Sequence, residues 1–165
     1  MQEQGDLRYF LTQKQKFDVR AVLILLHQNK VFVRQENTKR ELYILPGGAI
    51  KFNEESQAAA EREAREELGL TDLKLEFAGI LENFWKLKRI DYQQLNLIYR
   101  QEVSDETYHH LKYLDYRKFD LPPNSNMKWI KVDQAGEALQ PRGIVKTCYP
   151  NIAIQHLVNH QNIGF

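Results

Sequence analysis

The sequence predicts an α/β domain in which a mixed β-sheet is flanked by helices. Segments with strand-like and helix-like patterns follow one another along the chain, but without the strict β–α–β alternation of a parallel sheet. The 165 residues, of which 42% are hydrophobic, suffice for one globular core, and no repeat or long linker divides them. We therefore expect a polar tail at residues 1–7 and a single domain at residues 8–165.

The first part of this domain is expected to hold three strands that lead into a glycine loop. Apolar runs at 19–26 and 31–34 are separated by residues 27–30, which is the spacing of a β-hairpin. A third, short strand at 42–45 ends where Pro46-Gly47-Gly48 interrupts regular structure.

The strongest helix signal covers residues 54–68, which are rich in Ala, Glu, Arg and Gln. Gly69 is well placed to end this helix in a left-handed conformation. Asn53, which precedes the helix, tolerates a positive φ and is also a favourable N-cap residue.

The second half of the chain again mixes strand and helix patterns. Strands are expected at 73–81 and at 94–103, where apolar and polar residues alternate, and again at 127–132. Asp133 is a candidate cap for a short helix after the last of these strands. A final helix is expected near residues 151–160.

Composition argues against several classes of partner. The net charge of +1 gives no general attraction to nucleic acid or to a membrane surface. The longest apolar run, residues 21–26, is too short to cross a bilayer, and the first twenty residues lack the apolar segment of a signal peptide. The single cysteine, Cys148, excludes an intrachain disulfide. We therefore expect a cytoplasmic protein with no membrane association and no clear nucleic-acid-binding surface.

Three carboxylates share one face of the predicted 54–68 helix. Glu63, Glu66 and Glu67 are spaced i, i+3 and i+4, so their like charges repel one another. A Mg²⁺ ion would relieve this repulsion, because it binds carboxylate oxygens and keeps water or phosphate oxygens as its other ligands. The flexible pair Gly47-Gly48 lets the backbone offer a carbonyl to such an ion, and Arg62 is a candidate partner that orients Glu63. A solvated helix with Glu–Arg pairs is the alternative.

The same segment fits a longer pattern, G-x5-E-x7-R-E-U-x-E-E-x-G-U, in which U is an aliphatic residue. The chain carries every fixed identity of this pattern: Gly48, Glu54, Arg62, Glu63, Glu66, Glu67 and Gly69. Ala64 and Leu70 occupy the aliphatic positions. With this Nudix box at Gly48 to Leu70, the chain resembles the Nudix hydrolases over about residues 18–158.

This resemblance implies a fold, a reaction and a set of site residues. The implied fold is an α/β/α sandwich, and the implied reaction is hydrolysis of a nucleoside diphosphate linked to another moiety, with a small nucleotide as substrate. Metal binding falls to Glu63, Glu66, Glu67 and the Gly47 carbonyl, with Mg²⁺ as the ion and Mn²⁺ as its substitute. The resemblance is also compatible with a homodimer.

The resemblance leaves the position of the general base open. Glu63 or Glu66 would position the attacking water, and Arg62 would hold the carboxylates, so these three are the candidate catalytic residues. Candidates outside the box follow the 94–103 strand, although loop solubility is the better explanation of each: Glu102, Asp105 and Glu106.

Two other functions compete with hydrolysis of a small nucleotide. A Nudix-fold module could bind a nucleotide or nucleotide sugar without cleaving it, but loss of box carboxylates would favour that function and all are present. Hydrolysis at the 5′ end of RNA would require a basic track for the backbone, and none is visible in the sequence.

Several residues outside the box are weaker candidates. Five aromatic side chains could stack on a nucleobase, although aromatic residues in strands more often belong to the core: Tyr43, Phe84, Trp85, Tyr92 and Tyr99. Arg34, Lys39 and Arg40 precede the glycine loop and could meet phosphates, but a solvated hairpin end explains them equally well. His156 and His160 are expected on the surface of the final helix.

Overall fold

The computed structural model describes residues 5–37, 41–149 and 152–161. Within these ranges its strands are β1 (Arg8–Thr12), β2 (Gln15–His27), β3 (Lys30–Asn37), β4 (Glu41–Ile44), β5 (Gly47–Ala49), β6 (Glu76–Leu87), β7 (Ile90–Glu102), β8 (Asn126–Lys131), β9 (Leu139–Gln140) and β10 (Gln155–Gln161). Its α-helices are α1 (Ser56–Leu68), α2 (Asp105–Tyr113) and α3 (Val132–Ala135). Short 3₁₀ turns are η1 (Tyr116–Lys118), η2 (Gly136–Ala138) and η3 (Ile144–Thr147).

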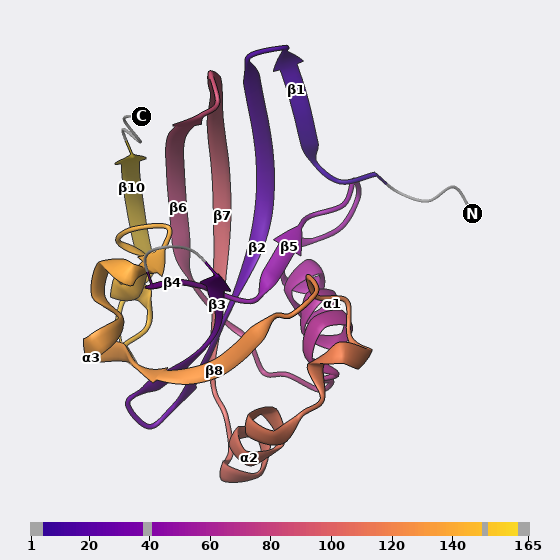
Figure 1. Ribbon diagram of the computed structural model, residues 1–165, viewed down its shortest axis with the longest axis vertical. Helices are drawn as coiled ribbons and strands as arrows, with labels where there is room; N and C mark the ends of the chain where they lie inside the picture. Colours follow the sequence, from indigo (N-terminus) through magenta and orange to yellow (C-terminus); the bar gives the residue numbers. More distant parts are fainter. Residues whose placement is uncertain (1–4, 38–40, 150–151, 162–165) are drawn as a thin grey trace.

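All described strands belong to one mixed sheet. Its main order is β10-β6-β7-β2-β3-β4-β9, with β1 and β5 attached to β2 and β8 attached to β3. The β2–β7 and β6–β10 pairs are parallel, whereas β6–β7, β2–β3 and β2–β5 are antiparallel. Figure 1 shows β6, β7 and β2 side by side as long strands, with α2 at the opposite end from the β6–β7 turn. The predicted mixed sheet is therefore confirmed.

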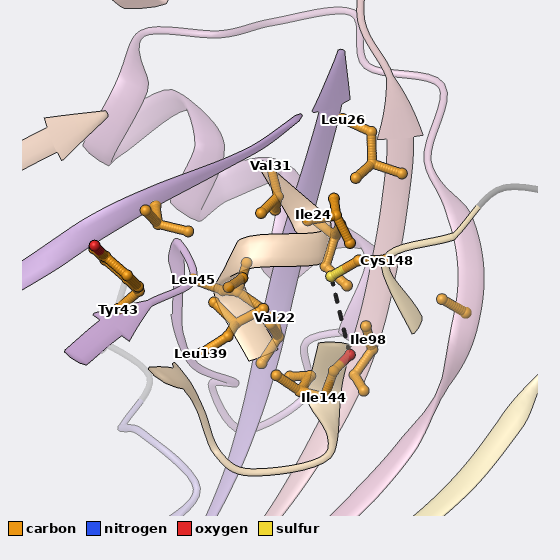
Figure 2. Packing of buried hydrophobic residues seen from close by; sticks show 14 of the residues in the cluster. Val22, Ile24, Leu26, Val31, Tyr43, Leu45, Ile98, Leu139, Ile144 and Cys148 are labelled. Atoms are coloured by element: carbon orange, nitrogen blue, oxygen red, sulfur yellow. Dashed lines mark hydrogen bonds between the residues drawn. The ribbon is translucent and has the colours of Figure 1, made fainter. Parts of the chain in front are cut away.

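Alternate residues of β2 pack against different helices. Leu23 and Leu25 belong to a buried cluster with Ala64 and Leu68 of α1 and Leu111 of α2. The intervening residues join a second cluster, partly drawn in Figure 2, with side chains from α3, β9 and η3: Val22, Ile24, Leu26, Val132, Ala135, Leu139 and Ile144. Because helical segments cover both faces of the sheet, the expected α/β/α arrangement is also confirmed.

Several local predictions hold residue by residue. The 27–30 hairpin forms, since His27 pairs with Lys30 across a tight turn. Gly69 ends α1 with φ +65°, and its N–H donates to Arg65 O at 3.0 Å. Asn53 adopts φ +60°, as expected for a residue that replaces glycine in a turn. The helix itself begins at Ser56, two residues later than predicted.

The predicted final helix is wrong. Residues 155–161 form the edge strand β10, which runs parallel to β6; residue 151 of the prediction lies outside the described residues. Burial alternates along β10, because Leu157 and Asn159 face inward whereas His156 and Val158 are exposed. His156 and His160 do lie on the surface, but on a strand: His160 stacks on a neighbouring aromatic ring of β6.

Other elements extend beyond the predicted ranges. The strand predicted at 73–81 runs instead from Glu76 to Leu87, and a turn at Lys88 and Arg89 joins it to β7. Both turn residues have positive φ, a conformation usually signalled by Asn or Gly, so the sequence offers no sign of this turn. Helix α2 is also unpredicted, although Ser104 caps it by accepting a hydrogen bond from the Thr107 N–H at 3.1 Å.

The N-terminal residues that the structure describes contact the loop after β5. Asp6 pairs with Lys51 in a β-bridge, and the Leu7 N–H donates to Ile50 O at 2.7 Å. Residues 1–4 of the expected tail lie outside the described residues, and the division into a tail and a single domain stays a prediction. Within the described ranges, every helix is too short or too polar for a membrane-spanning segment.

Cys148 is expected to be unreactive in the folded protein. Its side chain is 1% exposed, within the cluster of Figure 2, and burial raises the pKa of its thiol to about 12. Because the thiolate is the nucleophile, alkylation by iodoacetamide at pH 8 should be far slower in native protein than in urea. Mass spectrometry of timed samples measures both rates. Equal rates would contradict the buried position.

Candidate active site

Arg62 is the centre of a hydrogen-bond network on α1. Its Nε and Nη2 donate to the two oxygens of Glu54 at 2.7 and 3.0 Å, and Nη1 donates to Glu63 at 2.6 Å and to Glu66 at 3.0 Å. Nη2 also donates to Ala49 O at 3.0 Å. These bonds use all five N–H groups of the guanidinium. A lysine could not replace Arg62, because its ammonium group has only three N–H donors. The bonds to Arg62 lower the pKa of Glu54, and Glu54 in turn raises the pKa of Arg62.

The close approach of α1 to the glycine loop requires a residue without a side chain at position 48. A Cβ atom on Gly48 would collide with the carboxylate of Glu63. Gly48 pairs with Ala21 of β2, so the loop is anchored to the central strand of the sheet. The sheet thereby positions Glu63 between Gly48 and Arg62.

The peptide unit of Gly47 is bound from both sides. Its N–H donates to Glu67 Oε2 at 3.0 Å, and its carbonyl oxygen accepts a hydrogen bond from Arg20 Nη2 at 2.6 Å. Gly47 has φ +132°, and a Cβ atom there would collide with the carbonyl of Ala21. Only glycine fits this position, where Arg20 holds its carbonyl oxygen and Glu67 holds its N–H.

Burial shifts the pKa values of the charged side chains around the Gly47 peptide. It raises the pKa of Glu67 to about 7, an effect that the hydrogen bond from Gly47 and the nearby Arg20 partly oppose. Burial also lowers the pKa of Arg20, against the attraction of Glu67 and Glu63. The site therefore holds charged groups of both signs in a poorly solvated environment, where electrostatic interactions are strong.

The donor set suits a hard divalent cation. Glu63, Glu66, Glu67 and the Gly47 carbonyl offer only oxygen ligands, which Mg²⁺ and Mn²⁺ prefer. In the described part of the chain no three acidic, histidine or cysteine side chains are arranged to hold a metal. Glu63 and Glu66 instead bind Arg62, and Glu67 binds the Gly47 N–H. A bound cation would therefore replace some of these hydrogen bonds of the carboxylates.

The candidate bases outside the box lie elsewhere. Glu102 accepts a hydrogen bond from the Gln28 N–H at 2.7 Å, and Asp105 lies 3.1 Å from His27 Nε2. Both therefore contact the β2–β3 hairpin. Glu106 lies in the first turn of α2, and no contact joins it to the box in the described structure.

Two cavities adjoin the glycine loop. The smaller, of about 170 Å³, is lined by Arg34, Gly47 and Glu67 among others. The larger, of about 470 Å³, has an apolar and amide lining that includes Trp85 and Gln94. Both cavities are also lined by Arg20, Ile44 and Leu45.

The aromatic candidates separate into two groups. Trp85 lines the larger cavity, and Tyr92 stacks on it with ring centroids 4.8 Å apart. The other three are engaged away from this cavity: Phe84 stacks on a histidine of β10, the Tyr99 hydroxyl bonds to a serine of α1, and Tyr43 packs in the core.

Arg20 is the site residue that the sequence analysis missed. It stands in the strand of residues 19–26, where a single arginine before an apolar run reads as a solvent-facing side chain. Its partner Gly47 is 27 positions away, so only the fold brings them together. Of the basic candidates for phosphate contact, Arg34 lines the smaller cavity, whereas Lys39 and Arg40 lie outside the described residues.

A family model described as the NUDIX domain matches residues 17–148 of this sequence. The chain therefore belongs to the NUDIX family and is a Nudix pyrophosphohydrolase. An 8-oxo-dGTP diphosphatase of Buchnera aphidicola subsp. Schizaphis graminum is 28% identical over 111 residues, which cover 63% of this chain and 85% of that protein. That of Buchnera aphidicola subsp. Acyrthosiphon pisum is 33% identical over 66 residues, or 40% and 53% of the two chains.

Solved structures agree on the fold. The mutator MutT protein from Bacillus halodurans superposes with a TM-score of 0.61 at 17% identity, covering 87% of this chain and 90% of that one. A mutT/nudix family protein from Listeria innocua gives a TM-score of 0.52 at 21% identity, with coverages of 79% and 90%.

Proposed function

We propose that this protein is a Mg²⁺-dependent hydrolase, with Mn²⁺ as a substitute ion, that cleaves the pyrophosphate linkage of a nucleoside diphosphate joined to another moiety. The observation that carries this proposal is the position of Glu63, Glu66 and Glu67. Glu67 accepts the Gly47 N–H, Glu63 and Glu66 accept hydrogen bonds from Arg62 on the same helix, and two cavities lie beside this arrangement. Arg62 offsets part of the repulsion among these like charges, and a divalent cation would offset the rest.

Each site residue has a part in this proposal. Glu63, Glu66, Glu67 and the Gly47 carbonyl would hold the cation, which would neutralise the pyrophosphate and activate water. Arg62 is a positioning residue, because its bonds to Glu63 and Glu66 restrict where those carboxylates can lie. Glu63 or Glu66 would accept the proton of the attacking water at a carboxylate oxygen.

A small nucleotide is the proposed substrate. The Buchnera relatives are 8-oxo-dGTP diphosphatases, which supports a nucleoside triphosphate as one member of the class. The two cavities differ in lining, one charged and one largely neutral, and this difference supports a substrate with a phosphate part and an uncharged part.

Release of a nucleoside monophosphate, with and without metal, tests this function. The purified protein should hydrolyse at least one of dGTP, 8-oxo-dGTP, ADP-ribose and a dinucleoside polyphosphate in millimolar Mg²⁺. Addition of EDTA should abolish the reaction, and excess Mg²⁺ or Mn²⁺ should restore it, because the metal supplies both charge stabilisation and the activated water. Absence of product across the panel, or equal rates in EDTA, would overturn the proposal.

Two further expectations belong to the same proposal. We place the protein in the cytoplasm, since its single cysteine is buried and gives no disulfide; fractionation of cells would test this. The homodimer implied by the family resemblance stays a prediction, which sedimentation equilibrium of the purified chain would decide.

A further inference from the structure

The two cavities beside the glycine loop meet at Arg20. Its side chain lines both, together with the apolar residues Ile44 and Leu45. A ligand that occupies both cavities must therefore pass the guanidinium of Arg20. Arg20 stands on β2, where it pairs with Ala49 of β5 and Asn96 of β7, so its backbone is fixed within the sheet on both sides.

Arg20 has unused hydrogen-bonding capacity. Its Nη2 donates to Gly47 O at 2.6 Å, and its remaining side-chain N–H groups have no partner among the described residues. It forms no ion pair with a described carboxylate, unlike Arg62 and Arg34, which pair with Glu54 and Glu36. The guanidinium is half-buried, and Glu67 and Glu63 attract it without forming an ion pair, so an anion that accepts its free N–H groups would add charge-assisted hydrogen bonds.

The linings of the two cavities indicate which end of a ligand each would take. The smaller cavity is lined by Gly47 and Glu67, two of the four proposed cation ligands, so it suits phosphate groups. Among the described residues that line the larger cavity, only Arg20 and Glu36 are charged. Its volume of about 470 Å³ lies in the range of small-molecule sites, and Trp85 offers an aromatic surface. The larger cavity therefore suits an uncharged nucleoside.

We propose that Arg20 binds the phosphate group attached to the nucleoside, with the nucleoside in the larger cavity and the rest of the pyrophosphate in the smaller one. This inference rests on the proposed function, since it assumes a nucleotide substrate. The same guanidinium also holds the Gly47 carbonyl. A carbonyl oxygen has two lone pairs, so the Arg20 bond leaves one free for a cation. Arg20 would thus connect phosphate binding with the position of a metal ligand.

Binding of a nucleoside and of its 5′-monophosphate, both measured in EDTA, tests this role without turnover. The probes are adenosine, guanosine, AMP and GMP, and the readouts are calorimetry and intrinsic tryptophan fluorescence, to which Trp85 contributes. For at least one pair, the wild-type protein should bind the monophosphate more tightly than the nucleoside. Arg20→Met should weaken binding of that monophosphate about tenfold or more, the magnitude of a charge-assisted hydrogen bond, and leave nucleoside binding unchanged.

Two further variants separate a phosphate contact from a structural effect. Arg20→Lys keeps the charge and should retain part of the preference for the monophosphate. Arg65→Met is the matched control: Arg65 is an exposed arginine of α1 that lines neither cavity, and its replacement should change nothing. Thermal melting of each variant reports whether it is folded.

Three outcomes would overturn the role of Arg20. They are a wild-type protein with no preference for a monophosphate, an Arg20→Met variant with undiminished preference, and a variant in which nucleoside and monophosphate binding fall equally. Failure of the proposed function is a different result. If no nucleotide is hydrolysed in Mg²⁺ but Arg20→Met selectively loses monophosphate binding, the hydrolase proposal fails and the phosphate contact stands.

Discussion

Replacement of Glu67 by Gln is expected to reduce the rate of nucleotide hydrolysis by about 10²–10³-fold without loss of the fold. The amide is neutral and a poorer ligand for Mg²⁺, so the charge that the cation supplies to the phosphate would be lost. Its oxygen can still accept the Gly47 N–H, which Glu67 accepts at 3.0 Å. The free energy of unfolding should therefore be unchanged or slightly raised, because a buried carboxyl group is removed.

Glu55→Gln is the control for this change. Glu55 immediately precedes α1 and lies outside the fixed box positions, and it is exposed. Initial rates over a range of Mg²⁺ concentrations, with circular dichroism of both variants, make the comparison. If the Glu67→Gln variant keeps a near-parental rate at saturating Mg²⁺, Glu67 does not bind the metal. Equal small effects of both changes would instead support a merely solvated helix face.

Gly48→Ala is expected to remove most of the activity while leaving stability within about 1 kcal/mol of the parent. Gly48 does not need a left-handed backbone, so alanine is compatible with its conformation. The new methyl group would, however, displace the carboxylate of Glu63, which is the flexible end of a long side chain. A misplaced metal ligand and water-positioning group should lower kcat about 10²-fold.

Gly47→Ala provides the contrast for that prediction. Here the methyl group would meet the backbone carbonyl of Ala21, which cannot move aside, and φ of +132° is strained for alanine. We expect a loss of about 2–4 kcal/mol in the free energy of unfolding, measured by urea denaturation. If Gly48→Ala destabilises the protein as much as Gly47→Ala does, its activity loss would report unfolding and not displacement of Glu63.

The box helix was predictable because its signals are local. The spacing of Glu63, Glu66 and Glu67, the left-handed Gly69 and the positive φ of Asn53 each depend on a few neighbouring residues. The hairpin at residues 27–30 was predictable for the same reason. Such patterns hold wherever the surrounding fold agrees with them.

Features set by distant pairing were not predictable. Strand β10 (Gln155–Gln161) pairs in parallel with β6, and its short sequence carries no apolar alternation strong enough to distinguish strand from helix. Arg20 gains its significance only because β5 brings Gly47 against β2. Likewise, the sequence indicates Arg62 as a neighbour of Glu63, but its bonds to Glu54 arise when the loop folds back onto α1.

The saturation of Arg62 has a consequence for how this site can vary among related sequences. Because every N–H group of its guanidinium is already engaged, no donor is left to compensate for a change at any one partner. Glu54 accepts two of these bonds although it lies eight residues before Arg62. Loss of Glu54 would leave two N–H groups of Arg62 without their acceptors, and loss of Arg62 would leave three carboxylates without their shared donor, so the two should be inherited as a pair. Homologues that lose one are expected to have lost the other as well.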